Sequence, residues 1–309
     1  MAMAHWTWDT ALRGVIPPMI SPLTSAQQVD GAAVKRLVDY ILDGGCSGLF
    51  VLGGTGEGAW LTWSQREAIV RSTVQAANGR APVLVGVMLP GTAPARDSAL
   101  QAVDAGADAL VVGSPYYFAV EATAQLRHIE AILAATSLPV VLYNIPQCTH
   151  QPIAREAIEA LASEPRMLGI KDSSGDLPYF QFLLSIKRAR PAFRVLQGLE
   201  SAAAPSLLVG ADGLIPGLAN VAPRLLSDLV RAAHAGHVHT CGELQEQVVD
   251  LAGIYSGGLA ALYAACALLG LSENVPAEPW GPIDAADQQS IAAILERHGL
   301  LRTPVASSR

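Results

Sequence analysis

The sequence predicts an α/β protein, namely a (β/α)8 TIM barrel followed by a helical appendage at the carboxyl terminus. Short apolar runs recur about every 25 to 30 residues, and each is followed by a helical pattern, which is typical of repeated βα units. Most of these runs are nearly all apolar, as strands covered on both faces must be. After the eighth unit the strand signals stop and helical patterns remain.

Eight apolar runs predict eight strands. Gly, Pro or Asp bounds each run, and no break interrupts the spacing of the units. A closed barrel is therefore favoured over an open doubly wound sheet, which is the competing architecture. The predicted strands are residues 14–20, 48–53, 82–88, 109–114, 139–145, 167–172, 193–198 and 213–217.

Helices are predicted between these strands and after the last of them. Residues 31–43 show apolar side chains at helical spacing after Asp30, which is suited to cap a helix. Beyond Gly236, three further helices are expected, at about 240–255, 258–270 and 285–298.

The chain of 309 residues suits one large α/β domain with an appendage. We predict a barrel domain over residues 1–236 and a helical region over residues 237–309. Because no low-complexity tract or linker separates the two, the helical region is expected to pack against the barrel.

Composition limits the classes of function. The net charge of −7 argues against a nucleic-acid surface, because phosphate binding needs clustered Lys and Arg. The longest apolar run, residues 257–271, is shorter than the roughly 20 residues that a membrane helix needs. The first ten residues lack the basic start and apolar stretch of a secretion signal. We expect a cytoplasmic enzyme that acts on a small molecule.

Neither cysteine nor histidine suggests a metal site. The four cysteines lie far apart and form no Cys-x-x-Cys pair, so reduced thiols are expected. His234, His237 and His239 fall at the end of the last predicted barrel helix without a neighbouring carboxylate, which favours a solvated loop. No metal and no organic cofactor is predicted.

Lysine is rare in this chain, which contains only Lys35, Lys171 and Lys187. The first and last fall in amphipathic helices, where a solvated role is expected. Lys171 ends the sixth predicted strand, and active sites of barrels lie at the carboxyl ends of their strands. An apolar interior would lower its pKa and yield a neutral amine that attacks a carbonyl. The alternative is a structural ion pair with Asp172 or Glu57.

Tyr143 ends the fifth predicted strand and should therefore lie beside Lys171. A phenol there could move the protons that imine formation and carbon–carbon cleavage require. The alternative is an aromatic plug at the mouth of the barrel.

A glycine-rich loop, residues 53–58, follows the second predicted strand. Its backbone N–H groups could hold an anion such as a carboxylate. A dinucleotide-binding loop is disfavoured, because the following strand lacks the acidic residue that would hold a ribose. A plain tight turn is the remaining alternative. Tyr116 and Tyr117 follow the fourth predicted strand and could add two phenols to the site. The alternative is that they form a structural aromatic cluster.

Four motifs stand at the ends of predicted strands: Gly-Gly-Thr-Gly-Glu, Pro-Tyr-Tyr, Leu-Tyr-Asn-Ile-Pro and Gly-Ile-Lys-Asp-Ser-Ser-Gly-Asp. In order and spacing they resemble the dihydrodipicolinate synthase and N-acetylneuraminate lyase family, from Gly14 to about Pro282. The resemblance implies a (β/α)8 barrel, usually a tetramer, and a Schiff base between pyruvate and Lys171. Tyr143 would match the family's proton-shuttling tyrosine.

The resemblance also implies roles for other residues. The amides of Gly54 and Thr55, with the Thr55 hydroxyl, would hold the carboxylate of a 2-oxo acid. Tyr117 would match a tyrosine that reaches into the site of a neighbouring subunit. Ile215 and Gly198 would line the pocket.

Two positions depart from the family pattern. Gly54 stands where a Thr or Ser usually joins the proton relay, so either water replaces this hydroxyl or Tyr143 acts alone. Cys148 stands where true dihydrodipicolinate synthases have an arginine that binds the carboxylate of the second substrate. A thiol cannot form that bidentate ion pair.

The sequence therefore predicts a Schiff-base lyase or aldolase that acts on a 2-oxo acid, such as a 4-hydroxy-2-oxo acid or a 2-keto-3-deoxy sugar acid. The alternatives are dihydrodipicolinate synthase proper, a sugar-acid dehydratase of the same family, and a non-catalytic 2-oxo acid binding protein. A homo-oligomer, tetramer or dimer, is expected. Substrate specificity is expected to lie in residues 114–120, 147–150 and 256–260.

Overall fold

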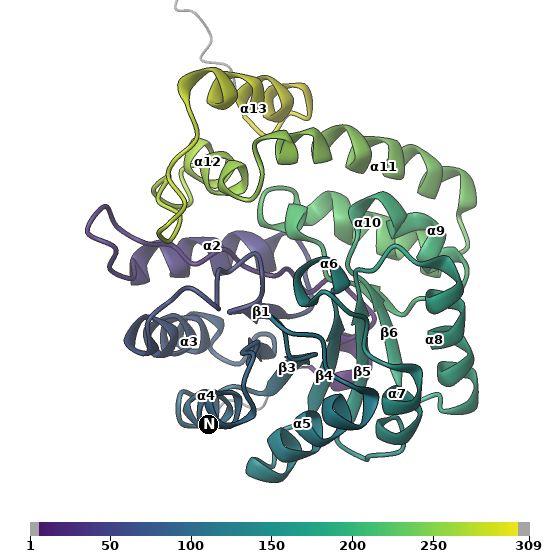
Figure 1. Cartoon of the computed structure of the whole chain (residues 1–309). Helices are drawn as coiled ribbons and strands as arrows, with labels where there is room; N and C mark the ends of the chain where they lie inside the picture. Colours follow the sequence, from purple (N-terminus) through teal and green to yellow (C-terminus); the bar gives the residue numbers. More distant parts are fainter. Residues whose placement is uncertain (1–5, 302–309) are drawn as a thin grey trace, which may run out of the picture.

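A computed structural model describes residues 6–301 of the chain, so the outer ends of both predicted domains, residues 1–5 and 302–309, lie outside the described part. Its centre is a parallel sheet of seven strands in the order β1 to β7, surrounded by helices (Figure 1). This is a TIM-barrel-like α/β fold. The strands are β1 (Leu49–Val51), β2 (Val83–Gly86), β3 (Ala109–Gly113), β4 (Val140–Asn144), β5 (Met167–Asp172), β6 (Arg194–Gln197) and β7 (Gly213–Leu214).

The prediction of a strand over residues 14–20 is wrong, since this segment forms only isolated bridges. Val15 pairs with Leu214 of β7, and Pro18 pairs with Phe50 of β1. Pro17 and Pro18 have no N–H group to donate, so this segment cannot form a continuous ladder of backbone hydrogen bonds. The segment nevertheless contacts both edge strands of the sheet.

The other seven predicted strands are present, with ends that differ by a few residues. The range of β5 matches the prediction, whereas β7 is three residues shorter than predicted. Parallel ladders connect each strand to the next in sequence, and one register places Tyr143 of β4 opposite Lys171 of β5.

Helices follow the strands and cover the outside of the sheet (Figure 1). The helix predicted over residues 31–43 is present, and Asp30 caps it by accepting a hydrogen bond of 3.0 Å from the Ala33 amide. The helices before the carboxyl-terminal region are α1 (Trp8–Ala11), α2 (Gly31–Asp43), α3 (Trp63–Ala77), α4 (Thr92–Asp104), α5 (Ala122–Ala135), α6 (Pro146–Thr149), α7 (Arg155–Leu161), α8 (Leu177–Ala189), η1 (Glu200–Ala202), α9 (Ala203–Leu208), η2 (Gly217–Asn220) and α10 (Pro223–His234).

The core has two layers. The inner layer lies inside the curled sheet and includes Phe50, Val111, Val141 and Leu196. The outer and larger layer lies between the strands and the helices that cover them. Because successive strand residues point to opposite faces, each of the strands β1 to β6 contributes to both layers.

The carboxyl-terminal region is helical, as predicted, and lies at one end of the molecule (Figure 1). Hydrogen bonds join it to the barrel: Gln245 binds both the Ala204 amide and the Glu200 carbonyl. Its elements are α11 (Val238–Leu251), η3 (Ala252–Gly257), α12 (Ala260–Leu268) and α13 (Ala285–Arg297).

Over residues 6–301, no single helix is long and apolar enough to cross a membrane. The segments 238–257 and 260–268 reach the length and apolar character of a membrane span only when they are combined, and a bend of 113° separates them.

Candidate active site

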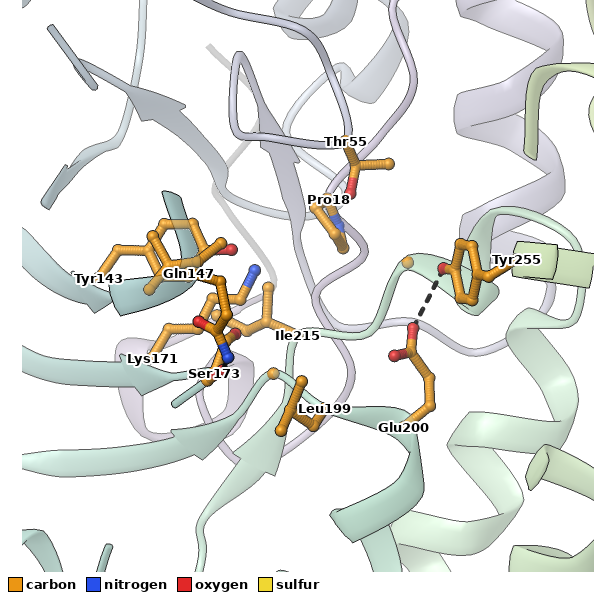
Figure 2. Close-up of a pocket in the computed structure, with 13 residues that line it drawn as sticks. Pro18, Thr55, Tyr143, Gln147, Lys171, Ser173, Leu199, Glu200, Ile215 and Tyr255 are labelled. Carbon is orange, nitrogen blue, oxygen red and sulfur yellow. Dashed lines mark hydrogen bonds between the residues drawn. The ribbon is translucent and has the colours of Figure 1, made fainter. Parts of the chain in front are cut away.

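Lys171 is the centre of the candidate site. It lies on the inner face at the carboxyl end of β5 and is 3% exposed. Its Nζ lies 4.0 Å from the ring centroid of Tyr143 and 5.5 Å from that of Phe50. Tyr143 is the register partner of Lys171 on the neighbouring strand, so the amine and the phenol face the same cavity (Figure 2).

Burial changes the protonation of both groups. It lowers the pKa of Lys171 from 10.5 to about 7, against the opposite effect of the Glu200 carboxylate. A large fraction of the amine is therefore neutral at neutral pH, which is the state that attacks a carbonyl. Burial raises the pKa of Tyr143 above its ordinary value, so the phenol keeps its proton.

The alternative in which Lys171 forms an ion pair with Asp172 or Glu57 is wrong. Asp172 accepts a hydrogen bond of 2.7 Å from the Asn144 side chain and one of 3.0 Å from the Ser174 hydroxyl. Glu57 accepts a hydrogen bond of 2.7 Å from the Tyr263 hydroxyl. Both carboxylates are thus engaged elsewhere.

A pocket of about 310 Å³ opens above Lys171. Segments at the carboxyl ends of the strands form it, where barrel enzymes place their sites, together with η3. Lys171, Tyr143 and Gln147 lie on one side of it, and Glu200 and Tyr255 on the other (Figure 2). The lining residues are Pro18, Thr55, Tyr143, Ile145, Gln147, Lys171, Ser173, Gly198, Leu199, Glu200, Ile215, Gly217 and Tyr255.

The structure brings together five of the seven site residues predicted from the sequence. The two that do not line the pocket are Gly54 and Tyr117. Gly54 is exposed beside Thr55, and a Cβ added to it would meet no atom within 4 Å. Tyr117 is 77% exposed and packs edge-on against Phe118, with ring centroids 4.8 Å apart. The five that line the pocket are Thr55, Tyr143, Lys171, Gly198 and Ile215.

Glu200 and Tyr255 are pocket residues that the sequence did not reveal. The Tyr255 hydroxyl donates to Glu200 Oε1 at 3.2 Å, and the Leu218 amide donates to the same oxygen at 3.1 Å. Glu200 lies three residues after the end of β6. An acidic residue just beyond the carboxyl end of a barrel strand is a signal that could have identified it as a site residue. Tyr255 comes from η3, and only the tertiary fold brings it to the pocket.

Of the three loops expected to set specificity, 147–150 contributes Gln147 to the lining, whereas 114–120 and 256–260 contribute no lining residue. Gln147 donates from Nε2 to the Ser173 carbonyl at 2.8 Å, which holds its side chain across the end of β5. The neighbouring Cys148 is exposed.

The residues considered for metal binding are dispersed. In the described part of the chain, no three His, Cys, Asp or Glu side chains are grouped so as to hold an ion. His239 is 89% exposed, while the His234 ring binds the Asp212 carbonyl at 3.1 Å. All four cysteines are free.

Residues 11–298 match the model of the dihydrodipicolinate synthetase family. The chain is 36% identical to a 4-hydroxy-tetrahydrodipicolinate synthase of Salinibacter ruber, with 91% of this chain and 93% of that protein covered. It is 33% identical to a probable 2-dehydro-3-deoxy-D-pentonate aldolase of Escherichia coli, covering 79% and 81% of the two chains.

A solved structure with the same architecture is a prophage protein of the dihydrodipicolinic acid synthase family from Escherichia coli K12, in complex with pyruvate. It superimposes with a TM-score of 0.88 at 29% identity and covers 93% of this chain and 99% of its own. The match therefore extends over the barrel and the carboxyl-terminal helices alike. The chain belongs to the dihydrodipicolinate synthetase family and is a carbon–carbon lyase of that type.

Proposed function

We propose that this protein is a Schiff-base aldolase that cleaves or forms a 4-hydroxy-2-oxo acid, such as a 2-keto-3-deoxy sugar acid, with Lys171 as the nucleophile. The observation that carries the proposal is the buried Lys171 amine, with a pKa of about 7, beside the Tyr143 phenol. A buried amine of this kind is suited to nucleophilic catalysis on a ketone.

In the cleavage direction, Lys171 Nζ attacks C2 of the 2-oxo acid. The C2 oxygen leaves as water, with a proton delivered through Tyr143, and an iminium ion remains. Removal of the proton from the 4-hydroxyl breaks the C3–C4 bond, releases an aldehyde and leaves the enamine of pyruvate. Protonation at C3 and hydrolysis then free pyruvate and restore the amine. The iminium nitrogen is the electron sink, so the scheme uses no metal or organic cofactor.

The loop after β1 is suited to hold the carboxylate of the 2-oxo acid. Thr55 lines the pocket, and a loop at the end of a parallel strand can present backbone N–H groups to an anion. We assign the amides of Gly54 and Thr55 and the Thr55 hydroxyl to this carboxylate. Ile215 would close the apolar wall beside the reacting carbons.

The other side of the pocket is suited to an aldehyde that carries hydroxyl groups. Glu200 accepts hydrogen bonds, and the Tyr255 phenol can both donate and accept. A second carboxylate would be repelled by Glu200, and Lys171 is the one basic side chain among the residues described as lining the pocket. With Cys148 in place of an arginine, this arrangement favours a sugar-derived aldehyde over aspartate semialdehyde, the partner in dihydrodipicolinate synthase proper.

Three further features belong to this proposal. We propose that residues 14–20 close the sheet into a (β/α)8 barrel, with residues 237–309 as its helical appendage. We also propose a homo-oligomer in which the exposed Tyr117 reaches the site of a second copy. A cytoplasmic location remains a prediction.

A substrate panel tests the proposal. The purified protein is incubated with 2-keto-3-deoxy sugar acids of four to six carbons, and separately with pyruvate plus aspartate semialdehyde. We expect equimolar pyruvate and aldehyde from a sugar acid, and none from Lys171→Met. A dehydrated product with no pyruvate would indicate a dehydratase, and turnover only with aspartate semialdehyde would indicate a synthase; either result contradicts the proposal.

A further inference from the structure

Glu57 is a buried carboxylate that the proposed reaction does not use. It lies two residues after Thr55 in the loop that follows β1, and it is 3% exposed. Its side chain reaches α12 and the segment before α13. It therefore connects the proposed carboxylate-binding loop to the carboxyl-terminal region of the chain.

Two hydrogen bonds hold the Glu57 carboxylate. Its Oε2 accepts from the Tyr263 hydroxyl at 2.7 Å and from the Ala277 amide at 2.8 Å. The Tyr263 hydroxyl in turn accepts from the Ser21 amide at 3.1 Å, and the Ser21 hydroxyl donates to the Gly56 carbonyl at 2.7 Å. These contacts form a closed ring that returns to the loop at the residue between Thr55 and Glu57.

The backbone of Glu57 also shapes the loop. Its amide donates to the Gly54 carbonyl at 3.0 Å, which closes a turn around Thr55. Glu57 has a φ of 53°, in the left-handed region that side-chain-bearing residues seldom occupy. A residue in this conformation needs support from its surroundings, and the side-chain bonds of Glu57 supply it.

Glu57 is an unfavourable residue for a purely structural contact. Its Oε1 is buried and has no hydrogen-bond partner in the described structure, and burial raises the pKa of the carboxyl. Burying an incompletely paired acid destabilises a fold. Departures from local rules of this kind are expected at functional sites.

We propose that Glu57 is a positioning residue, which acts through Tyr263 and Ala277 to hold the Gly54-Thr55 turn in the conformation that binds the substrate carboxylate. The carboxyl-terminal helices are thereby part of the construction of the active site. This inference rests on the proposed function, in which that turn binds the 2-oxo acid.

The test is the pyruvate concentration that gives half-maximal borohydride trapping on Lys171. For Glu57→Ala we expect this concentration to rise about tenfold or more, the equivalent of about 1.4 kcal/mol, while the rate of trapping at saturation changes little. Tyr263→Phe should shift it in the same direction by a smaller factor. Glu57→Gln keeps an acceptor for both donors and should restore most of the affinity.

Tyr40→Phe is the matched control, because it removes a tyrosine hydrogen bond of 2.6 Å to the Val221 carbonyl, away from the loop. It should leave the half-saturating concentration unchanged. An unchanged value in folded Glu57→Ala and Tyr263→Phe would overturn the inference, and so would a loss of maximal rate alone. No adduct in the wild-type protein would contradict the proposed function itself and, with it, this inference.

Discussion

Because Gly198 has no side chain, the Lys171 side chain can occupy the space beside it. A Cβ added at position 198 would lie 2.7 Å from Lys171 Cε and 2.0 Å from the Ser173 hydroxyl oxygen. Gly198 follows β6 directly, beside the strand that carries Lys171, so the absence of a side chain there determines where the amine can stand.

Gly198→Ala should therefore displace the amine. We expect imine formation to slow about 100-fold, because a displacement of about 1 Å at a reacting group can have an effect of this size. The measurement is the rate of borohydride trapping with pyruvate. Gly242→Ala in α11 is the control, since a Cβ there meets no atom within 4 Å. Equal trapping by both variants would refute the steric argument.

Tyr143→Phe should preserve the ring beside Lys171 and remove the proton carrier. We expect turnover to fall about 10²- to 10⁴-fold, the range typical of lost general acid–base catalysis. Pyruvate affinity should change little. Steady-state kinetics with an active substrate checks this, and a decrease below tenfold would show that another group moves the protons.

The pH dependence of imine formation should report the buried amine. The rate should rise with pH through an apparent pKa of about 7, as Lys171 loses its proton. Because the Glu200 carboxylate raises the pKa of Lys171, Glu200→Gln should move the midpoint to lower pH. Trapping rates between pH 5.5 and 9 measure both effects, and a midpoint that moves upward in Glu200→Gln would contradict them.

Lys171→Met should raise the thermal stability at neutral pH, because it removes a buried amine. The native state loses the proton of Lys171 near pH 7 and the unfolded state near pH 10.5, so between these values the unfolded state binds more protons. The free energy of unfolding of the wild-type protein should therefore rise with pH relative to the variant across this window. Denaturant unfolding at several pH values checks it. A constant difference would mean that the native pKa is not lowered.

Gly217→Ala should affect only the aldehyde side of the pocket. A Cβ at this position would lie 2.3 Å from the Tyr255 hydroxyl oxygen and 3.5 Å from Glu200 Oε1. We expect KM for the sugar acid to rise about tenfold or more, as when a pocket loses one or two well-placed hydrogen bonds, while trapping of pyruvate stays unchanged. A parallel loss of pyruvate trapping would show that the two sides of the pocket do not act separately.

Lys171 and Tyr143 could be located from the sequence because each ends a predicted strand, and consecutive parallel strands are neighbours in a barrel. That one regularity places them side by side, as the register of β4 and β5 confirms. A lowered pKa of Lys171 could also be expected from the sequence, since the strands around it are apolar.

The contact between Glu200 and Tyr255 could not be predicted in the same way. It joins η1 to η3, and helices in the carboxyl-terminal region have no register that relates them to the strands. The first strand was predicted wrongly for a local reason: the run 14–20 is apolar, but its two prolines interrupt the ladder. An apolar pattern indicates that a segment is buried, but it does not show whether the backbone N–H groups needed for strand pairing are present.

The most direct test of the central claim is borohydride reduction of the purified protein in the presence of pyruvate, followed by mass spectrometry of the intact chain and of its peptides. The account predicts one reduced pyruvate adduct per chain on the peptide that contains Lys171, and none on Lys171→Met. A folded wild-type protein that forms no adduct, or an adduct on Lys35 or Lys187 instead, would contradict it.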